Sequence, residues 1–116
     1  MLEQLLYLSR LFDLYGPLLT EKQQECLRLH LFEDFSLSEI GEELGISRQA
    51  VYDNIHRSQK AMEAYEAKLG LAARYQAERQ ELASVAEEVR ALRQPGNAEM
   101  VERILDQLAP LMGQEV

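Results

Sequence analysis

Six side chains between residues 48 and 60 have the chemistry needed to bind a nucleic acid. On a helix they share one outer face with Asp53: Arg48, Gln49, Tyr52, His56, Arg57 and Lys60. Arg48 and Gln49 stand in the first turn, where arginine can bond to guanine and glutamine to adenine. Arg57 and Lys60 lie further along and suit phosphate groups. Because such a helix usually enters the major groove by its N-terminal end, these six residues are the predicted interface.

A helix-turn-helix over residues 37–60 would hold that face outward. Gly41 stands inside the first helix, where a larger side chain would collide with the second helix at their closest approach. Gly45 can take a positive φ in the turn, and Ser47 can cap the second helix. The inner faces would share a small apolar core made by Ile40, Leu44, Ile46, Val51 and Ile55. The same pattern also occurs in ordinary helical bundles, and helix-turn-helix folds also serve as protein contacts.

Capping and breaker residues divide the N-terminal half into further helices. Apolar spacing predicts a first helix over residues 2–15, ended by Gly16-Pro17. A second helix is expected to run to about Phe32. Two helix starts match the capping-box pattern, Thr20 with Gln23 and Ser36 with Glu39. These helices and the motif make up a predicted helix-turn-helix domain of residues 1–69.

Residues 70–116 are predicted to form a C-terminal helical extension used for oligomerisation or packing. An apolar pattern continues from Gly70 to Arg93, and its near-heptad stripe contains Tyr75, Leu82, Val85, Val89 and Leu92. Gln94-Pro95-Gly96 predicts a turn, after which Asn97 is expected to cap a last helix. The predicted buried face of that helix contains Val101, Ile104, Leu105, Leu108 and Leu111. The fold class is therefore all-α, a helical bundle containing the helix-turn-helix and followed by a helical extension.

More apolar face is present than one small core is expected to absorb. The first helix is apolar on more than one side, and the stripe from Tyr75 to Leu92 needs a partner surface. A homodimer is the expected solution, because two-fold dimers are the commonest oligomers. The alternative is that the C-terminal helices fold back and cover both surfaces within one chain.

The charge distribution limits what the predicted interface can bind. The 116 residues carry a net charge of −8, which argues against indiscriminate coating of nucleic acid. The segment 47–60 nevertheless holds three Lys or Arg residues against Asp53 alone, whereas residues 33–43 hold five acids and no base. A locally basic helix on an acidic background predicts narrow, salt-sensitive binding.

Other classes of function find little support. No run of about 18 apolar residues exists and the start of the chain lacks the basic character of a secretory signal, so neither membrane insertion nor export is expected. Cys26 is the single cysteine, which fits a reducing cytoplasm and a place in the core. His30 and His56 are far apart in the sequence and lack a Cys or carboxylate cluster at ligand spacing, so no metal site is expected. Without a phosphate loop or a nucleophile motif, we expect neither a cofactor nor an enzyme.

Two family resemblances sharpen this interpretation. Residues 18–60, with the Ile-His-Arg run at 55–57, resemble region 4 of bacterial sigma factors of the extracytoplasmic-function type. Residues 11–69 resemble the YlxM family through three strings: LFDLYGPLLTEKQ, SLSEI and ISRQAVYDNI. That resemblance implies a cytoplasmic accessory role in the pathway of the signal recognition particle and no catalytic residues.

Two classes of function remain open. The favoured one is a regulator that binds nucleic acid, either the RNA of the signal recognition particle or promoter DNA. The other is an adaptor that contacts signal recognition particle proteins and modulates the targeting GTPases without binding nucleic acid.

Overall fold

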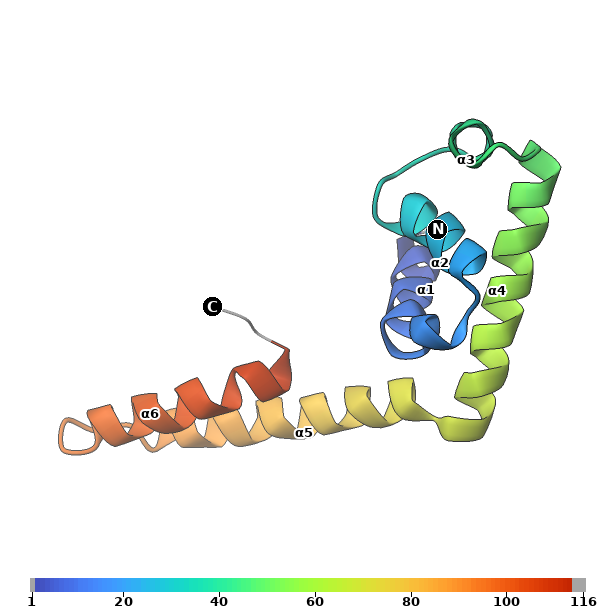
Figure 1. Ribbon diagram of the computed structural model, residues 1–116. Helices are drawn as coiled ribbons and strands as arrows, with labels where there is room; N and C mark the ends of the chain where they lie inside the picture. The colour runs from blue at the N-terminus through green and yellow to red at the C-terminus, as the bar shows by residue number, and fades with distance from the viewer. Residues whose placement is uncertain (1, 114–116) are drawn as a thin grey trace. The chain divides into compact units, whose positions relative to one another are not determined.

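The computed structural model describes residues 2–113, and within that range it contains helices and no strand. Figure 1 shows the helices in chain order. Their bounds are α1 Leu2–Tyr15, α2 Glu21–Leu31, α3 Leu37–Leu44, α4 Arg48–Leu69, α5 Leu71–Ala91 and α6 Ala98–Leu108, with short 3₁₀ turns η1 Gly16–Leu18 and η2 Pro110–Met112. The all-α prediction is confirmed. None of these helices is long and apolar enough to cross a membrane.

The chain divides into two compact units, one ending at Ala72 and the other beginning at Ala73. We call the described parts of these units the N-terminal region (residues 2–72) and the C-terminal region (residues 73–113). The N-terminal region contains α1 to α4 and the start of α5. The C-terminal region contains the rest of α5, α6 and η2.

Hydrogen bonds at the predicted caps fix where the helices of the N-terminal region begin. Both capping boxes form: Thr20 Oγ1 accepts from the Gln23 N–H at 3.2 Å, and Ser36 Oγ accepts from the Glu39 N–H at 3.1 Å. The reciprocal bonds from the two cap N–H groups to the Gln23 and Glu39 side chains are 3.0 and 2.8 Å. Ser47 Oγ accepts from the Ala50 N–H at 3.0 Å and starts α4. The predicted helix starts are therefore confirmed.

Gly41 and Gly45 allow α3 and α4 to pack closely, as predicted. A Cβ on Gly41 would lie 2.7 Å from the backbone oxygen of Ile46, a separation that real Cβ atoms do not show. Gly45 ends α3 with a φ of 71°, in the left-handed region that glycine adopts without strain. In Figure 1, α3 is seen nearly end-on while α4 stands upright beside it. This steep crossing over a very short turn is the geometry of a helix-turn-helix.

Two apolar clusters hold α4 against the rest of the N-terminal region. The predicted core of the motif forms one of them, in which Cys26, Ile40 and Val51 are fully buried and Leu44, Ile46 and Ile55 pack around them. The other joins α1, α2 and α4 through Leu8, Leu11, Tyr15, Leu19, Leu27 and Met62. Ile55 packs against both clusters, so the outer face of α4 rests on a continuous core.

A polar network closes the far end of α4. Gly70 leaves the helix with a φ of 62°, and the buried Tyr15 hydroxyl donates a 2.6 Å hydrogen bond to Glu66 Oε1. The same oxygen accepts from the Ala72 N–H at 3.0 Å, and the Leu71 N–H donates to Tyr15 Oη at 3.3 Å. Burial first, and then the bond to Glu66, raise the pKa of Tyr15. The network therefore ties α1 to the start of α5.

The C-terminal region is a helical pair with little core. Figure 1 shows α6 running back along α5 after the turn at residues 94–96, and a Cβ on Gly113 would lie 3.5 Å from Arg79. Arg93 and Glu102 form an ion pair across the turn. The buried hydrophobic residues of this region are Ala86 and Val101. The packing of α5 and α6 therefore buries very few side chains.

Two predictions for α6 are wrong. Asn97 occupies the N-cap position, but its side chain makes no cap bond; it accepts from the Gln94 N–H at 2.6 Å and donates to the Leu92 oxygen at 2.8 Å. The preceding turn thus competes successfully for the amide. Of the predicted buried face, Val101 is buried, but Ile104 is 37% and Leu111 61% exposed, because α5 covers only part of that stripe.

Candidate nucleic-acid interface

The outer face of α4 exposes all six side chains predicted to bind nucleic acid. Ser47 caps α4, so Arg48 is its first residue, and Arg48 and Gln49 of the first turn are both exposed. Side chains four residues apart lie one above the other on a helix. One row of the outer face is therefore formed by Arg48, Tyr52, His56 and Lys60, and the adjacent row by Gln49, Asp53 and Arg57.

The structure separates the two rows by giving each a groove of its own. The Tyr52 groove, on one flank of α4, has a volume of about 300 Å³ and is lined by His30, Leu37, Tyr52, Ile55, His56 and Gln59. The rings of Tyr52 and His56 lie parallel, with an interplanar angle of 6° and centroids 6.0 Å apart. His30 comes from the last turn of α2 and Leu37 from the start of α3. Two residues widely separated in the sequence, His30 and His56, thus share one groove.

The Arg57 groove, on the other flank, has a volume of about 400 Å³. Its lining combines α2 and α4: Thr20, Lys22, Gln23, Ile46, Ala50, Asp53, Asn54 and Arg57. Lys22 places a second cation beside Arg57, against the single carboxylate of Asp53. The side-chain oxygen of Asn54 is buried there without a hydrogen-bond partner. This groove therefore offers an excess of positive charge, with two cations against one carboxylate.

Gln49 and Glu39 have hydrogen bonds that bear on recognition. Gln49 Nε2 donates to Asp53 Oδ1 at 3.1 Å, so the carboxamide is held along the helix with its oxygen still available. The Ser36 backbone N–H bonds to Glu39 and lowers the pKa of that carboxyl group. Glu39 therefore stays ionised at neutral pH. It keeps a negative charge on α3, the helix that precedes α4.

Gln59, His30 and Lys22 are among the lining residues that were not predicted from the sequence. Gln59 follows Tyr52 by seven positions and Ile55 by four, so helical spacing alone could have placed it beside them. His30 and Lys22 belong to α2, and no local pattern connects that helix with the outer face of α4. They enter the site through the packing of α2 on α4.

Residues 2–113 contain neither a metal-ligand cluster nor an exposed cysteine. No group of three or more His, Cys, Asp or Glu side chains in that range is arranged to hold a metal ion. Cys26 is buried in the core as predicted, and burial raises the pKa of its thiol. A buried, protonated thiol is a poor nucleophile.

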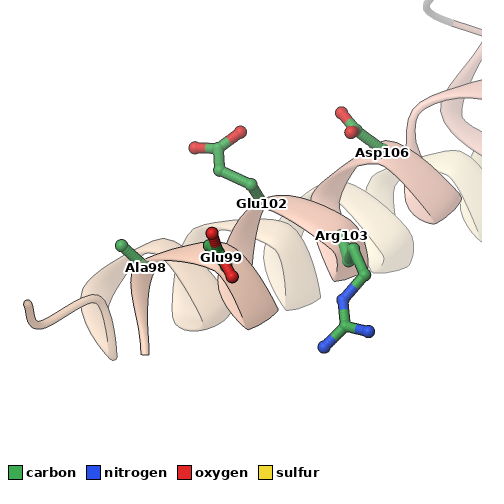
Figure 2. A pocket seen from close by; sticks show the side chains of 5 residues that line it. All are labelled: Ala98, Glu99, Glu102, Arg103 and Asp106. Carbon is green, nitrogen blue, oxygen red and sulfur yellow. The ribbon is translucent and has the colours of Figure 1, made fainter. Parts of the chain in front are cut away.

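A third depression, of about 530 Å³, lies on α6 and has the opposite charge character. Its lining residues are Ala98, Glu99, Glu102, Arg103 and Asp106. Figure 2 shows Glu102 and Asp106 on one side of the helix and Arg103 pointing away from them. The side chains diverge from one helix and three of them are carboxylates, which repel phosphates. We therefore place the candidate interface on α4.

The steep pairing of α3 and α4, with an exposed and locally basic second helix, defines a helix-turn-helix protein. Residues 2–104 match the family model described as "Putative helix-turn-helix protein, YlxM / p13 like". The chain belongs to this family, known as UPF0122, and the predicted resemblance to YlxM is confirmed.

Relatives cover most of the chain. The UPF0122 protein of Lacticaseibacillus casei (strain BL23) is 43% identical over 104 residues, which are 88% of this chain and 92% of the relative. That of Thermoanaerobacter sp. (strain X514) is 36% identical over 107 residues, 92% of each chain. The protein of Latilactobacillus sakei subsp. sakei (strain 23K) is 55% identical over 69 residues, 60% of this chain and 61% of the relative.

Proposed function

We propose that the protein is a nucleic-acid-binding regulator, accessory to the signal recognition particle pathway in the cytoplasm, and that it binds through the outer face of α4. The observation that carries this proposal is the exposure of all six predicted side chains on a capped helix whose inner face packs on an apolar core. The link to the particle rests on the YlxM resemblance of residues 11–69. The six residues are Arg48, Gln49, Tyr52, His56, Arg57 and Lys60.

The two ends of the face have different proposed roles. Arg48 and Gln49 occupy the first turn of α4, which reaches furthest into a groove and can read base edges. Arg57 and Lys60 lie two and three turns further along and contact phosphates. Lys22, which shares the Arg57 groove, is positioned to add a third phosphate contact.

The acidic remainder of the chain makes this binding selective. With a net charge of −8, the protein as a whole repels phosphates, whereas the segment 47–60 of α4 and its cap carries three Lys or Arg residues against one Asp. Because the attraction to phosphates comes from the cations of this one face, salt that screens them should lower the affinity between low and physiological concentrations. A target whose shape fits the outer face of α4 should therefore bind with higher affinity than an arbitrary duplex.

Fluorescence anisotropy with labelled duplex DNA and with signal recognition particle RNA, over a salt series, tests the proposal. We expect binding of at least one of them at low salt and a sharp loss of affinity toward physiological salt. Preference for the RNA would support the targeting role, whereas preference for duplex DNA would favour a transcriptional regulator. A protein that binds neither but captures a targeting GTPase would be an adaptor, and the proposal would fail.

We also propose that the protein is a homodimer. On α1, four apolar side chains remain exposed: Leu2 70%, Leu5 41%, Leu6 50% and Tyr7 38%. The C-terminal region exposes a further set, Tyr75, Val85, Leu92, Met100, Ile104 and Leu111. Light scattering coupled to gel filtration should give twice the mass of 13.3 kDa. A monomer at tens of micromolar would contradict the dimer.

A further inference from the structure

The Tyr52 groove contains features that a base-paired duplex would leave unused. Tyr52 is 52% exposed, and its ring lies parallel to that of His56 above the half-buried side chains of Leu37 and Ile55. In a duplex, neighbouring bases cover both faces of each base, so an exposed aromatic ring has nothing to stack on. An unpaired base presents a free face, and proteins bind such bases by stacking them on aromatic side chains.

Two polar side chains, His30 and Gln59, line the groove beside Tyr52. His30 Nδ1 is buried in the protein and has no hydrogen-bond partner among the described residues. Gln59 lines the same groove and carries a carboxamide, which both donates and accepts. The Gln59 carboxamide can therefore pair with either a donor or an acceptor on the edge of a base.

We infer that the Tyr52 groove binds a single unpaired nucleobase, stacked on Tyr52 with its edge toward His30 and Gln59. The inference rests on the proposed function and specifies the kind of target: a strand with a bulged or looped-out nucleotide rather than an uninterrupted duplex. Lys60 stands four residues after His56 in the same row, where it can hold a phosphate next to that base. At about 300 Å³, the groove lies at the lower end of the size range of small-ligand sites and suits one base.

A matched pair of RNA hairpins tests this inference on the full-length protein. One carries a single bulged nucleotide, supplied as an equal mixture of the four bases, and the other has the same stem fully paired. We expect the parent to bind the bulged hairpin more tightly by about 5- to 150-fold, the range that stacking one base on one aromatic side chain produces. Tyr52→Ala should abolish this preference, whereas Tyr52→Phe, which keeps the ring, should retain it.

Each other outcome would overturn the inference in an identifiable way. If the parent binds both hairpins equally, or if Tyr52→Ala keeps the preference for the bulge, the groove does not take a base, but the proposed function stands. If the parent binds neither hairpin, nor duplex DNA, both fail together. If free mononucleotides at millimolar concentration displace the bulged hairpin, the occupant is a free nucleotide rather than part of a strand. Circular dichroism of both variants checks that they fold, as expected for a half-exposed side chain.

Discussion

The N-terminal and C-terminal regions are both helical, but they differ greatly in how much apolar surface they bury. Among residues 2–113, nine buried hydrophobic side chains belong to the N-terminal region and two to the C-terminal region, Ala86 and Val101. The N-terminal region therefore has a core that can hold α4 in place. The C-terminal region has helices of similar length but exposes most of its apolar stripe. Such exposed apolar surface is typical of an element that packs against a partner.

A matched pair of leucine truncations should show the largest contrast between the regions. Leu27 is fully buried in the core of the N-terminal region, whereas Leu105 on α6 is only half-buried. Leu27→Ala should lower the free energy of unfolding by about 2–5 kcal/mol, the usual cost of a cavity in a core. Leu105→Ala should cost less than half as much. Urea unfolding of both variants measures the two losses of free energy. Equal losses would show that the C-terminal region has a core comparable to that of the N-terminal region.

Gly41→Ala should produce the next largest effect. The added Cβ would lie 2.7 Å from the Ile46 oxygen, so the turn that joins α3 to α4 must shift. Overpacking of this kind costs about 1–3 kcal/mol, and Gly41→Leu should cost more. Gly96→Ala in the turn before α6 is the matched control, because its Cβ would meet nothing within 4 Å and the cost should stay within about 0.5 kcal/mol. Thermal melting that does not distinguish Gly41→Ala from Gly96→Ala would contradict the close approach of the two helices.

The alkaline limit of stability should depend on Tyr15. Because burial raises its pKa, the folded protein keeps the phenolic proton at a pH where the unfolded chain has lost it. The free energy of unfolding should therefore be undiminished below pH of about 10, the ordinary tyrosine pKa, and should fall as the pH rises beyond it. Tyr15→Phe should lower the melting temperature at neutral pH, since it removes the bond to Glu66, and should flatten the alkaline decline. If the free energy of unfolding of Tyr15→Phe fell equally steeply at alkaline pH, a group other than Tyr15 would be responsible for the decline.

Local signals in the sequence predicted much of the fold. Capping residues such as Thr20, Ser36 and Ser47 mark helix starts by bonds within three residues, and Gly45 marks the turn by a backbone conformation. Such signals act at short range and are visible in the sequence. The extent of burial on α6 depends on how α5 covers it, which is why Ile104 was wrongly assigned to a buried face. Leu111 was assigned to the same face but lies beyond the end of α6, in η2.

The candidate site was predicted less completely than the fold, for the same reason. Spacing along α4 places its exposed side chains on one face, but the grooves beside that face need the walls that α2 and α3 supply. His30 and Lys22 enter these grooves only because α2 packs on α4. The helix-turn-helix pattern contains no information about that packing.

The central claim is that nucleic acid binds the outer face of α4 and not the C-terminal region. Two quadruple alanine variants with equal losses of charge test it: Arg48, Gln49, Arg57 and Lys60 on α4, against Arg74, Gln76, Arg90 and Arg103 in the C-terminal region. All eight side chains are exposed, so both variants should fold. The measurement is the affinity for the RNA or DNA target over a salt series. We predict that the α4 variant loses affinity and about two units of salt slope, one for each phosphate contact, while the other keeps the parental slope. Equal losses in the two variants, or parental binding by a folded α4 variant, would contradict the account.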